Sequence, residues 1–152
     1  MRVLVLNRPN LNMLGIRERQ LYGDRTYSEL VEFIKQEGKQ KGVFVQVSQS
    51  NCEGRLITAI QRARGRFDAI ILNAAGYTFT NIAILDALKA VSLPVVEVHL
   101  TDIGSREDFR KFSYVALYAE KVIVGKGFEG YAEALDYLFD KYGSSGGDGE
   151  KG

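Results

Sequence analysis

Short apolar runs alternate with helical patterns along this chain, and this alternation constrains the fold more than any other feature. The first, third and fifth runs are nearly continuous in apolar residues, which predicts strands buried on both faces. Alternating strands and helices are typical of βα units around a parallel sheet, so we expect an α/β fold. The predicted strands are Arg2–Leu6, Val43–Ser48, Ala69–Asn73, Val95–Leu100 and Lys121–Val124.

Helical patterns fill the intervals between these strands. Thr26–Glu29 and Ser50–Glu53 each place Ser or Thr three residues before Glu, the capping-box pattern that begins a helix. Apolar stripes follow at Leu30/Ile34 and Leu56/Ile60. Further helices are expected over Asn81–Val91 and Phe128–Tyr142, with a helical turn near Glu107–Phe112. Five βα units of this size fit a doubly wound, flavodoxin-like parallel sheet with strand order 2-1-3-4-5.

Length and composition predict one soluble domain. With 152 residues, 45% of them hydrophobic, the chain can bury a core; we expect one domain over 1–142 and a disordered Gly-rich tail over 143–152. The 20 Lys and Arg nearly balance 19 Asp and Glu, so no strong field favours nucleic acid or an anionic membrane. Cys52 is the only cysteine, and the N-terminal apolar run is too short for a signal peptide. We therefore expect a cytoplasmic protein that binds a small molecule or another copy of itself.

The predicted strand order also places the ligand site. In such sheets the crevice opens at the carboxyl ends of strands 1 and 3, where the order reverses. Loops over residues 7–25, 74–81 and 101–105 meet there. The first far exceeds the ~2–6 residues usual for a βα connection, which indicates a lid or binding loop.

Three functions known for related folds fit this sequence poorly. Gly125–Gly130 reads GxGxxG, but it lies in the last βα unit with no later strand to hold a ribose, so close helix–strand packing explains it better. A phosphorelay receiver needs an aspartate where strand 3 ends in Asn73, and an acidic pair where strand 1 ends in Asn7-Arg8. An FMN-binding flavodoxin needs a phosphate loop unlike Arg8–Asn12.

His99, the only histidine, ends the fourth predicted strand. Alternation along that strand puts Glu97 on the same face. A histidine there could merely hydrogen-bond a carbonyl, but its place at the crevice rim favours a functional role. Asn73 ends strand 3 at the same rim, although it could also be a turn-forming residue before Gly76.

Tyr22 lies in the long first loop, close in sequence to Arg17 and Arg19. A tyrosine beside Gly23 could simply pack over the sheet edge. A free phenol is only ~0.1% ionised at pH 7, and each unit by which a guanidinium lowers its pKa favours the phenolate by ~1.4 kcal/mol. A tyrosinate base opposite a histidine acid suggests proton abstraction paired with loss of a leaving group.

Five runs carry a resemblance to a known family: RPNLNMLGIRERQLYG, SQSNCEG, LNAAGYTFTN, DALKAVSLPVVEVHLTDIGSREDFRKFSY and VIVGKGFEGY. In order and spacing they resemble type II 3-dehydroquinate dehydratase, a flavodoxin-like lyase of the shikimate and quinate pathways. The resemblance extends to about Leu138. It implies dehydration of 3-dehydroquinate to 3-dehydroshikimate, no metal or organic cofactor, and a homododecamer built as a tetramer of trimers.

The resemblance also implies roles for the reacting groups. Tyr22 is the base that takes the C2 proton to give an enolate, and Arg17 on the lid lowers its pKa. His99 protonates the departing C1 hydroxyl with support from Glu97, while Asn10 lies near the reacting centre.

The implied substrate contacts lie on the neighbouring loops. Asn73 anchors the ligand and helps position His99 or a water, and Leu100 and Thr101 form the carboxylate-binding turn. The other matched residues are Arg110 for a ring hydroxyl, Arg106 for the lid region, and Asp86, which approaches a neighbouring subunit's site.

Three positions depart from the family pattern. Arg8 and Cys52 replace the usual Gly and His of two motifs, and Phe79 replaces a histidine that contacts the substrate. Because Tyr22 and His99 are retained, the expected reaction stays the same while substrate binding is altered. The alternative is a catalytically weak or non-enzymatic binder of a related cyclic polyol acid.

Overall fold

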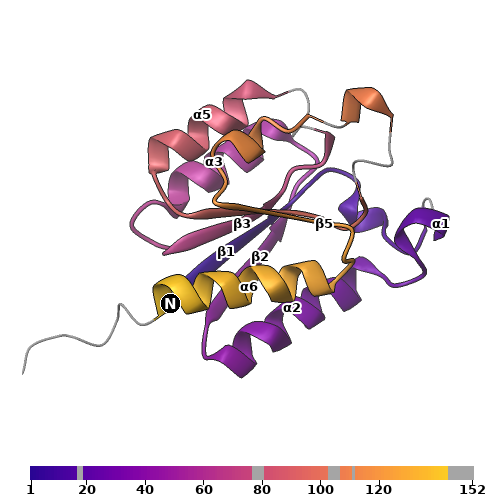
Figure 1. The fold of residues 1–152 in the computed structure, drawn as a ribbon, viewed down its shortest axis with the longest axis horizontal. Helices are drawn as coiled ribbons and strands as arrows, with labels where there is room; N and C mark the ends of the chain where they lie inside the picture. Colours follow the sequence, from indigo (N-terminus) through magenta and orange to yellow (C-terminus); the bar gives the residue numbers. More distant parts are fainter. Residues whose placement is uncertain (17–18, 77–80, 103–106, 111, 144–152) are drawn as a thin grey trace, which may run out of the picture.

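The computed structural model of the chain describes residues 1–16, 19–76, 81–102, 107–110 and 112–143 (Figure 1). Within them, five parallel strands form one sheet in the order β2-β1-β3-β4-β5, which confirms the predicted topology. The strands are β1 (Arg2–Asn7), β2 (Phe44–Gln49), β3 (Ala69–Asn73), β4 (Val95–His99) and β5 (Lys121–Val124).

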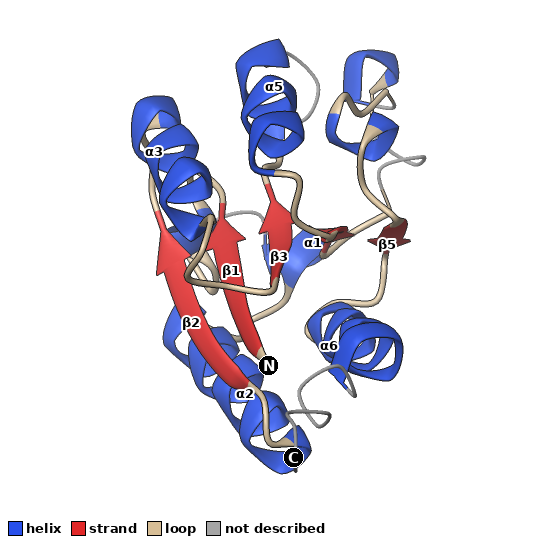
Figure 2. Ribbon diagram, turned by 90° about the vertical axis from the view of Figure 1, so that its left-hand side faces the viewer, coloured by secondary structure: helices blue, strands red, loops and turns tan. Residues whose placement is uncertain are grey.

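Helices cover both faces of the sheet (Figure 2). α2 (Tyr27–Lys41) and α6 (Glu129–Tyr142) pack on one face, and α3 (Glu53–Ala63) and α5 (Ile82–Val91) on the other. Two apolar clusters fill the layers, with Val3 and Val5 in the first and Leu4 and Leu6 in the second. The short elements are η1 (Leu11–Met13), α1 (Arg19–Tyr22), η3 (Asp108–Arg110) and η4 (Val115–Leu117).

Only one of the two predicted capping boxes begins a helix. The Thr26 side chain accepts a hydrogen bond from the Glu29 N–H at 3.2 Å, as expected. The prediction at Ser50 is wrong, because α3 begins at Glu53 and its N-cap is Cys52, whose side chain makes no capping bond. Ser50 Oγ instead accepts a hydrogen bond from the Cys52 N–H at 3.0 Å. This bond holds residues 50–52 in a turn, so the helix begins after them.

The prediction that strand 5 is buried on both faces is also wrong. β5 is an edge strand, and its Val122 is 40% exposed. β4 is instead buried along its whole length, like β3. An apolar run shows the composition of one strand, but it does not show whether that strand has one neighbour or two in the sheet. The sequence therefore could not show that β4 is a central strand and β5 an edge strand.

The region predicted as one long loop, residues 7–25, contains the short helices η1 and α1. The expected helical turn near residues 107–112 is η3. Residues 144–152 of the predicted tail lie outside the described residues.

Within Gly125–Gly130, Gly130 serves close packing of α6 on the sheet, as expected, and Gly125 and Gly127 form a turn with positive φ. A Cβ at Gly130 would lie 3.3 Å from Val98 Cγ1 and 3.4 Å from Ile123 Cγ2, so a larger residue there would require these side chains to shift by a few tenths of an ångström. The N–H groups of Gly125 and Gly127 donate to the carbonyls of His99 at 3.2 Å and Leu100 at 3.0 Å. This turn therefore fixes the carboxyl end of β4.

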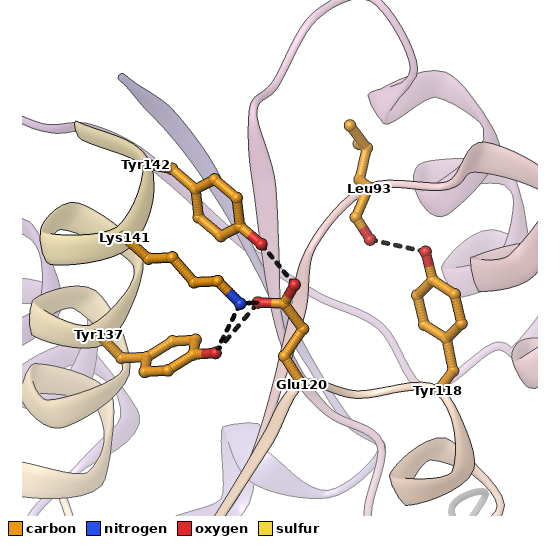
Figure 3. Close-up of polar contacts among 6 residues, drawn as sticks. All are labelled: Leu93, Tyr118, Glu120, Tyr137, Lys141 and Tyr142. Atoms are coloured by element: carbon orange, nitrogen blue, oxygen red, sulfur yellow. Dashed lines mark hydrogen bonds and ion pairs between the residues drawn. The ribbon is translucent and has the colours of Figure 1, made fainter. Parts of the chain in front are cut away.

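A polar cluster ties the end of α6 to the residue before β5 (Figure 3). Glu120 accepts hydrogen bonds from Tyr142, from Tyr137 at 3.2 Å and from Lys141 at 3.4 Å. Burial opposes ionisation of Glu120, but the bonds from Tyr142 and Lys141 outweigh it and lower the pKa of this carboxyl. The cluster lies at the amino ends of the strands, away from the expected crevice.

Candidate active site

The carboxyl end of β4 brings a histidine and a carboxylate into direct contact. His99 Nε2 lies 2.6 Å from Glu97 Oε1, as the alternation along the strand predicted. Both side chains are buried, with 6% of His99 and 0% of Glu97 exposed. A carboxyl group this deeply buried requires hydrogen-bond partners, so the pair has a fixed geometry.

Ser113 supplies a second donor to the same carboxylate. Its Oγ donates to Glu97 Oε1 at 2.6 Å and accepts from the Ala116 N–H at 3.1 Å. Ser113 was not identified from the sequence, because it lies sixteen residues from Glu97 and carries no spacing signal. It orients the carboxylate that in turn holds the imidazole.

A buried tyrosine links the ends of β1 and β3. The Tyr131 hydroxyl donates to Asn7 Oδ1 at 2.7 Å and accepts from Asn73 Nδ2 at 3.0 Å. Burial raises the pKa of Tyr131, so its hydroxyl stays neutral and can both donate and accept. Asn7 and Tyr131 were not identified from the sequence as site residues; here they fix the predicted ligand-binding Asn73.

Two buried acceptor atoms at this edge have no hydrogen-bond partner among the residues described. They are Asn73 Oδ1 and Glu97 Oε2, and a third buried atom, the donor Asn7 Nδ2, likewise meets the hydrogen-bond criteria with none of these residues. Buried polar groups without partners each cost ~1–3 kcal/mol, and such groups are concentrated at functional sites. The carboxyl ends of the strands, where these atoms lie, are therefore suited to a polar ligand.

The first loop adds a second asparagine. Asn10 adopts a left-handed backbone with φ 67° and caps η1, a conformation that asparagine tolerates better than most residues. Its N–H donates to Asn51 Oδ1 at 3.0 Å, and Gln49 Nε2 also donates to that oxygen at 3.1 Å. Asn51, itself bonded by Gln49 at the end of β2, thus fixes the position of Asn10 in the first loop.

Arg8, which departs from the family pattern, is 5% exposed. Its Nη1 donates to the Pro9 carbonyl at 3.2 Å. The guanidinium is close enough to Tyr131 to act on its hydroxyl electrostatically. A buried positive charge therefore lies near Tyr131, which bonds Asn7 and Asn73.

Five of the other predicted site residues are among those that the structure describes. Leu100 is buried and Thr101 half-buried directly after β4, whereas Asp86 is exposed on α5. Tyr22 is the last residue of α1 and Arg110 the last of η3. Arg17, Phe79 and Arg106 lie outside the described residues.

Two features are absent from the part of the chain that the structure describes. No group of three or more His, Cys, Asp or Glu residues there could hold a metal ion. In the same residues, no helix is both long and apolar enough to cross a bilayer.

Fold and site together define a doubly wound α/β protein with a buried histidine–carboxyl pair at the carboxyl end of its sheet. The chain belongs to the family described as dehydroquinase class II, whose model matches residues 1–139.

Two relatives named 3-dehydroquinate dehydratase are similar to nearly the whole chain. The 3-dehydroquinate dehydratase of Fusobacterium nucleatum is 48% identical over 145 residues, which cover 93% of this chain and 99% of that protein. The enzyme of the same name from Clostridium acetobutylicum is 45% identical over 138 residues, 91% of this chain and 96% of that protein.

A solved structure agrees with these sequence relatives. The crystal structure of type II dehydroquinase from Butyrivibrio crossotus is 43% identical, covers 91% of this chain and 97% of its own, and has a TM-score of 0.89. The resemblance read from the sequence is thus confirmed, and with it the flavodoxin-like fold.

Proposed function

We propose that this protein is a hydro-lyase that converts 3-dehydroquinate to 3-dehydroshikimate and water. Family membership supports the substrate. The observation that carries the proposal is the buried His99–Glu97 pair, 2.6 Å apart at the carboxyl end of β4, where a ligand crevice is expected in this fold.

The first step is proton abstraction at C2 of the substrate. Tyr22, as tyrosinate, takes this proton, and the electron pair of the C2–H bond moves toward the C3 carbonyl to give an enolate. Arg17 favours the phenolate, because a guanidinium beside a phenol lowers its pKa. Tyr22 is the last residue of α1, in the segment that joins the carboxyl end of β1 to α2.

The second step is loss of the C1 hydroxyl. The enolate collapses to the C3 ketone, a double bond forms between C1 and C2, and the hydroxyl leaves as water with a proton from His99. Glu97 holds one ring nitrogen, so the other can carry the proton that is transferred. Ser113 fixes Glu97 and acts only through that contact.

Side chains around these groups bind the substrate. Asn73, fixed by Tyr131, offers its unpaired Oδ1 to a substrate hydroxyl or a water. Leu100 and Thr101 bind the carboxylate through the turn after β4, and Arg110 binds a ring hydroxyl. Asn10 lies near the reacting centre, while Phe79 removes one donor that the family uses.

We further propose that the protein acts in the cytoplasm as a dodecamer, a tetramer of trimers. Asp86 is exposed on α5, as a residue that reaches a neighbouring subunit's site must be. Arg106 shapes the lid of its own site. Sedimentation equilibrium tests the assembly: a mass twelve times the 16.9 kDa chain is expected, and a monomer would refute it.

Conversion of 3-dehydroquinate by the purified protein tests the function. The product is a conjugated enone, so its ultraviolet absorbance should rise with time, in the presence of a chelator as well. His99→Ala serves as the control and should abolish most of the rise. No rise with wild type would reject the lyase.

Phe79 favours the second candidate, a non-catalytic binder of a related cyclic polyol acid. Calorimetric titration separates the two functions. Saturable binding of such an acid without turnover of 3-dehydroquinate would select the binder.

A further inference from the structure

We propose that a groove between α3 and β2 binds a small organic phosphate carrying at least two negative charges. The groove has a volume of about 650 Å³, within the range of small-molecule sites. None of its lining residues belongs to the candidate active site. The lining residues used here are Gln46, Ser48, Arg55, Thr58, Arg62 and Arg66.

The charge of the groove is the first argument. Arg55, Arg62 and Arg66 line it, and the lining contains no Asp or Glu. Within the described part of the chain, none of the three guanidiniums forms an ion pair with a carboxylate. Three unneutralised guanidiniums in one hollow favour an anion, and their planar forks match phosphate oxygens.

The helix geometry explains why these charges converge. Arg55 and Arg62 are seven residues apart on α3, which is two helical turns or about 10.5 Å along the axis, so both face β2. Glu53, the acid in the first turn of α3, is rotated about 200° from Arg55 and points away. The positive charges of Arg55 and Arg62 therefore suit a ligand whose negative charges are spread along the ligand's length.

The opposite wall is polar because β2 is an edge strand. Gln46 and Ser48 pair with Leu4 and Leu6 of β1, so they share the sheet face on which α3 packs. At the sheet edge, where α3 and β2 lie side by side (Figure 2), they offer an amide and a hydroxyl to a ligand. Thr58 of α3 adds a second hydroxyl.

The amino end of α3 opens into the same groove. Cys52 and Gly54 line it, and the Cys52 side chain does not cap the helix. The first-turn N–H groups of this eleven-residue helix thus receive no hydrogen bond from the Cys52 side chain, and they lie at the end of the groove nearest Arg55. A helix amino end beside guanidiniums and hydroxyls is a phosphate-binding arrangement.

The floor of the groove is apolar. Leu4, Ala59 and Phe67 line it, and Phe67 is 7% exposed. This surface can pack against an organic group but not against a bare inorganic anion. Charge, hydroxyls and floor together select a phosphorylated organic molecule.

Calorimetric titration of the full chain with ADP, tripolyphosphate and citrate tests the proposal. We expect saturable binding of ADP with one site per chain, weaker binding of tripolyphosphate, and weaker still of citrate. Arg55→Gln/Arg62→Gln should weaken ADP binding by roughly tenfold or more. Arg64→Gln removes the same charge beside the end of α3 but does not line the groove, so it should bind ADP as wild type does.

A second measurement does not depend on any variant. In NMR spectra of wild type, ADP should shift the amide signals of Gly54, Arg55 and Thr58 most strongly. No saturable ADP binding, equal binding of citrate, equal loss in Arg64→Gln, or shifts centred elsewhere would each overturn the proposal. A changed sedimentation mass in the double variant, without ADP binding by wild type, would assign the groove to a subunit contact instead.

Discussion

Replacing Tyr131 by phenylalanine should both destabilise the fold and weaken substrate binding. The ring volume is nearly kept, so no large cavity forms, but two buried amides lose a partner: Asn7 Oδ1 and Asn73 Nδ2. Each buried group left unpaired costs ~1–3 kcal/mol, so we expect the free energy of unfolding to fall by about 3 kcal/mol in total. For a chain of this length that lowers Tm by roughly 6–12 °C.

Urea denaturation followed by circular dichroism measures the stability change, and steady-state kinetics measures the effect on the site. Asn73 loses the acceptor that fixes its amide, so substrate binding should weaken by ~1 kcal/mol or more. KM for 3-dehydroquinate should therefore rise several-fold. Tyr137→Phe on the same helix is the matched control, since its hydroxyl bonds Glu120 away from the crevice. A Tyr131→Phe protein within ~0.5 kcal/mol of wild type, with unchanged KM, would refute the reasoning.

Three further predictions follow from other contacts. Ser113→Ala should lower kcat roughly tenfold with little change in KM, because Glu97 loses a donor and His99 its fixed orientation, and Ser113→Thr should restore kcat; unaltered kinetics in Ser113→Ala would remove this positioning role. Glu120→Gln should destabilise the fold by up to ~1 kcal/mol at pH 7, since this carboxyl is 28% exposed. The pKa of Glu120 is lowered in the fold, so its contribution is present above the unfolded value near 4.5 and is lost as pH falls below it; urea titrations showing an equal difference at pH 7 and pH 3 would contradict this. Phe79→His should strengthen substrate binding by ~1–3 kcal/mol and so lower KM, with kcat nearly unchanged. An unchanged or raised KM would mean that the pocket has already compensated for the missing donor or prefers another ligand.

Much of the scaffold could be predicted because local patterns and tertiary structure agree. The apolar run Ala69–Asn73 is buried along its length, and the stripe Leu30/Ile34 packs into the core. Alternation along β4 placed Glu97 beside His99, because neighbours two apart on a strand share a face. These features depend on the segment's own sequence.

The rest depended on contacts between distant segments. Tyr131 lies 58 residues from Asn73 and 124 from Asn7, so no local spacing could join them. Ser50 fitted a capping box, but its hydroxyl bonds the Cys52 N–H and the helix begins later. The exposure of Val122 follows from the place of β5 in the sheet. Tertiary packing, and not local propensity, determines these hydrogen bonds, this helix start and this exposure.

Turnover by Tyr22→Phe tests the central claim, a tyrosinate base opposite the His99 acid, most directly. The enone absorbance assay gives kcat for wild type and variant, and calorimetry with the product 3-dehydroshikimate shows whether the site remains intact. We expect almost no turnover with product binding retained, because the ring stays and only the base is lost. A variant that keeps more than roughly a tenth of kcat would place the base elsewhere and contradict the account.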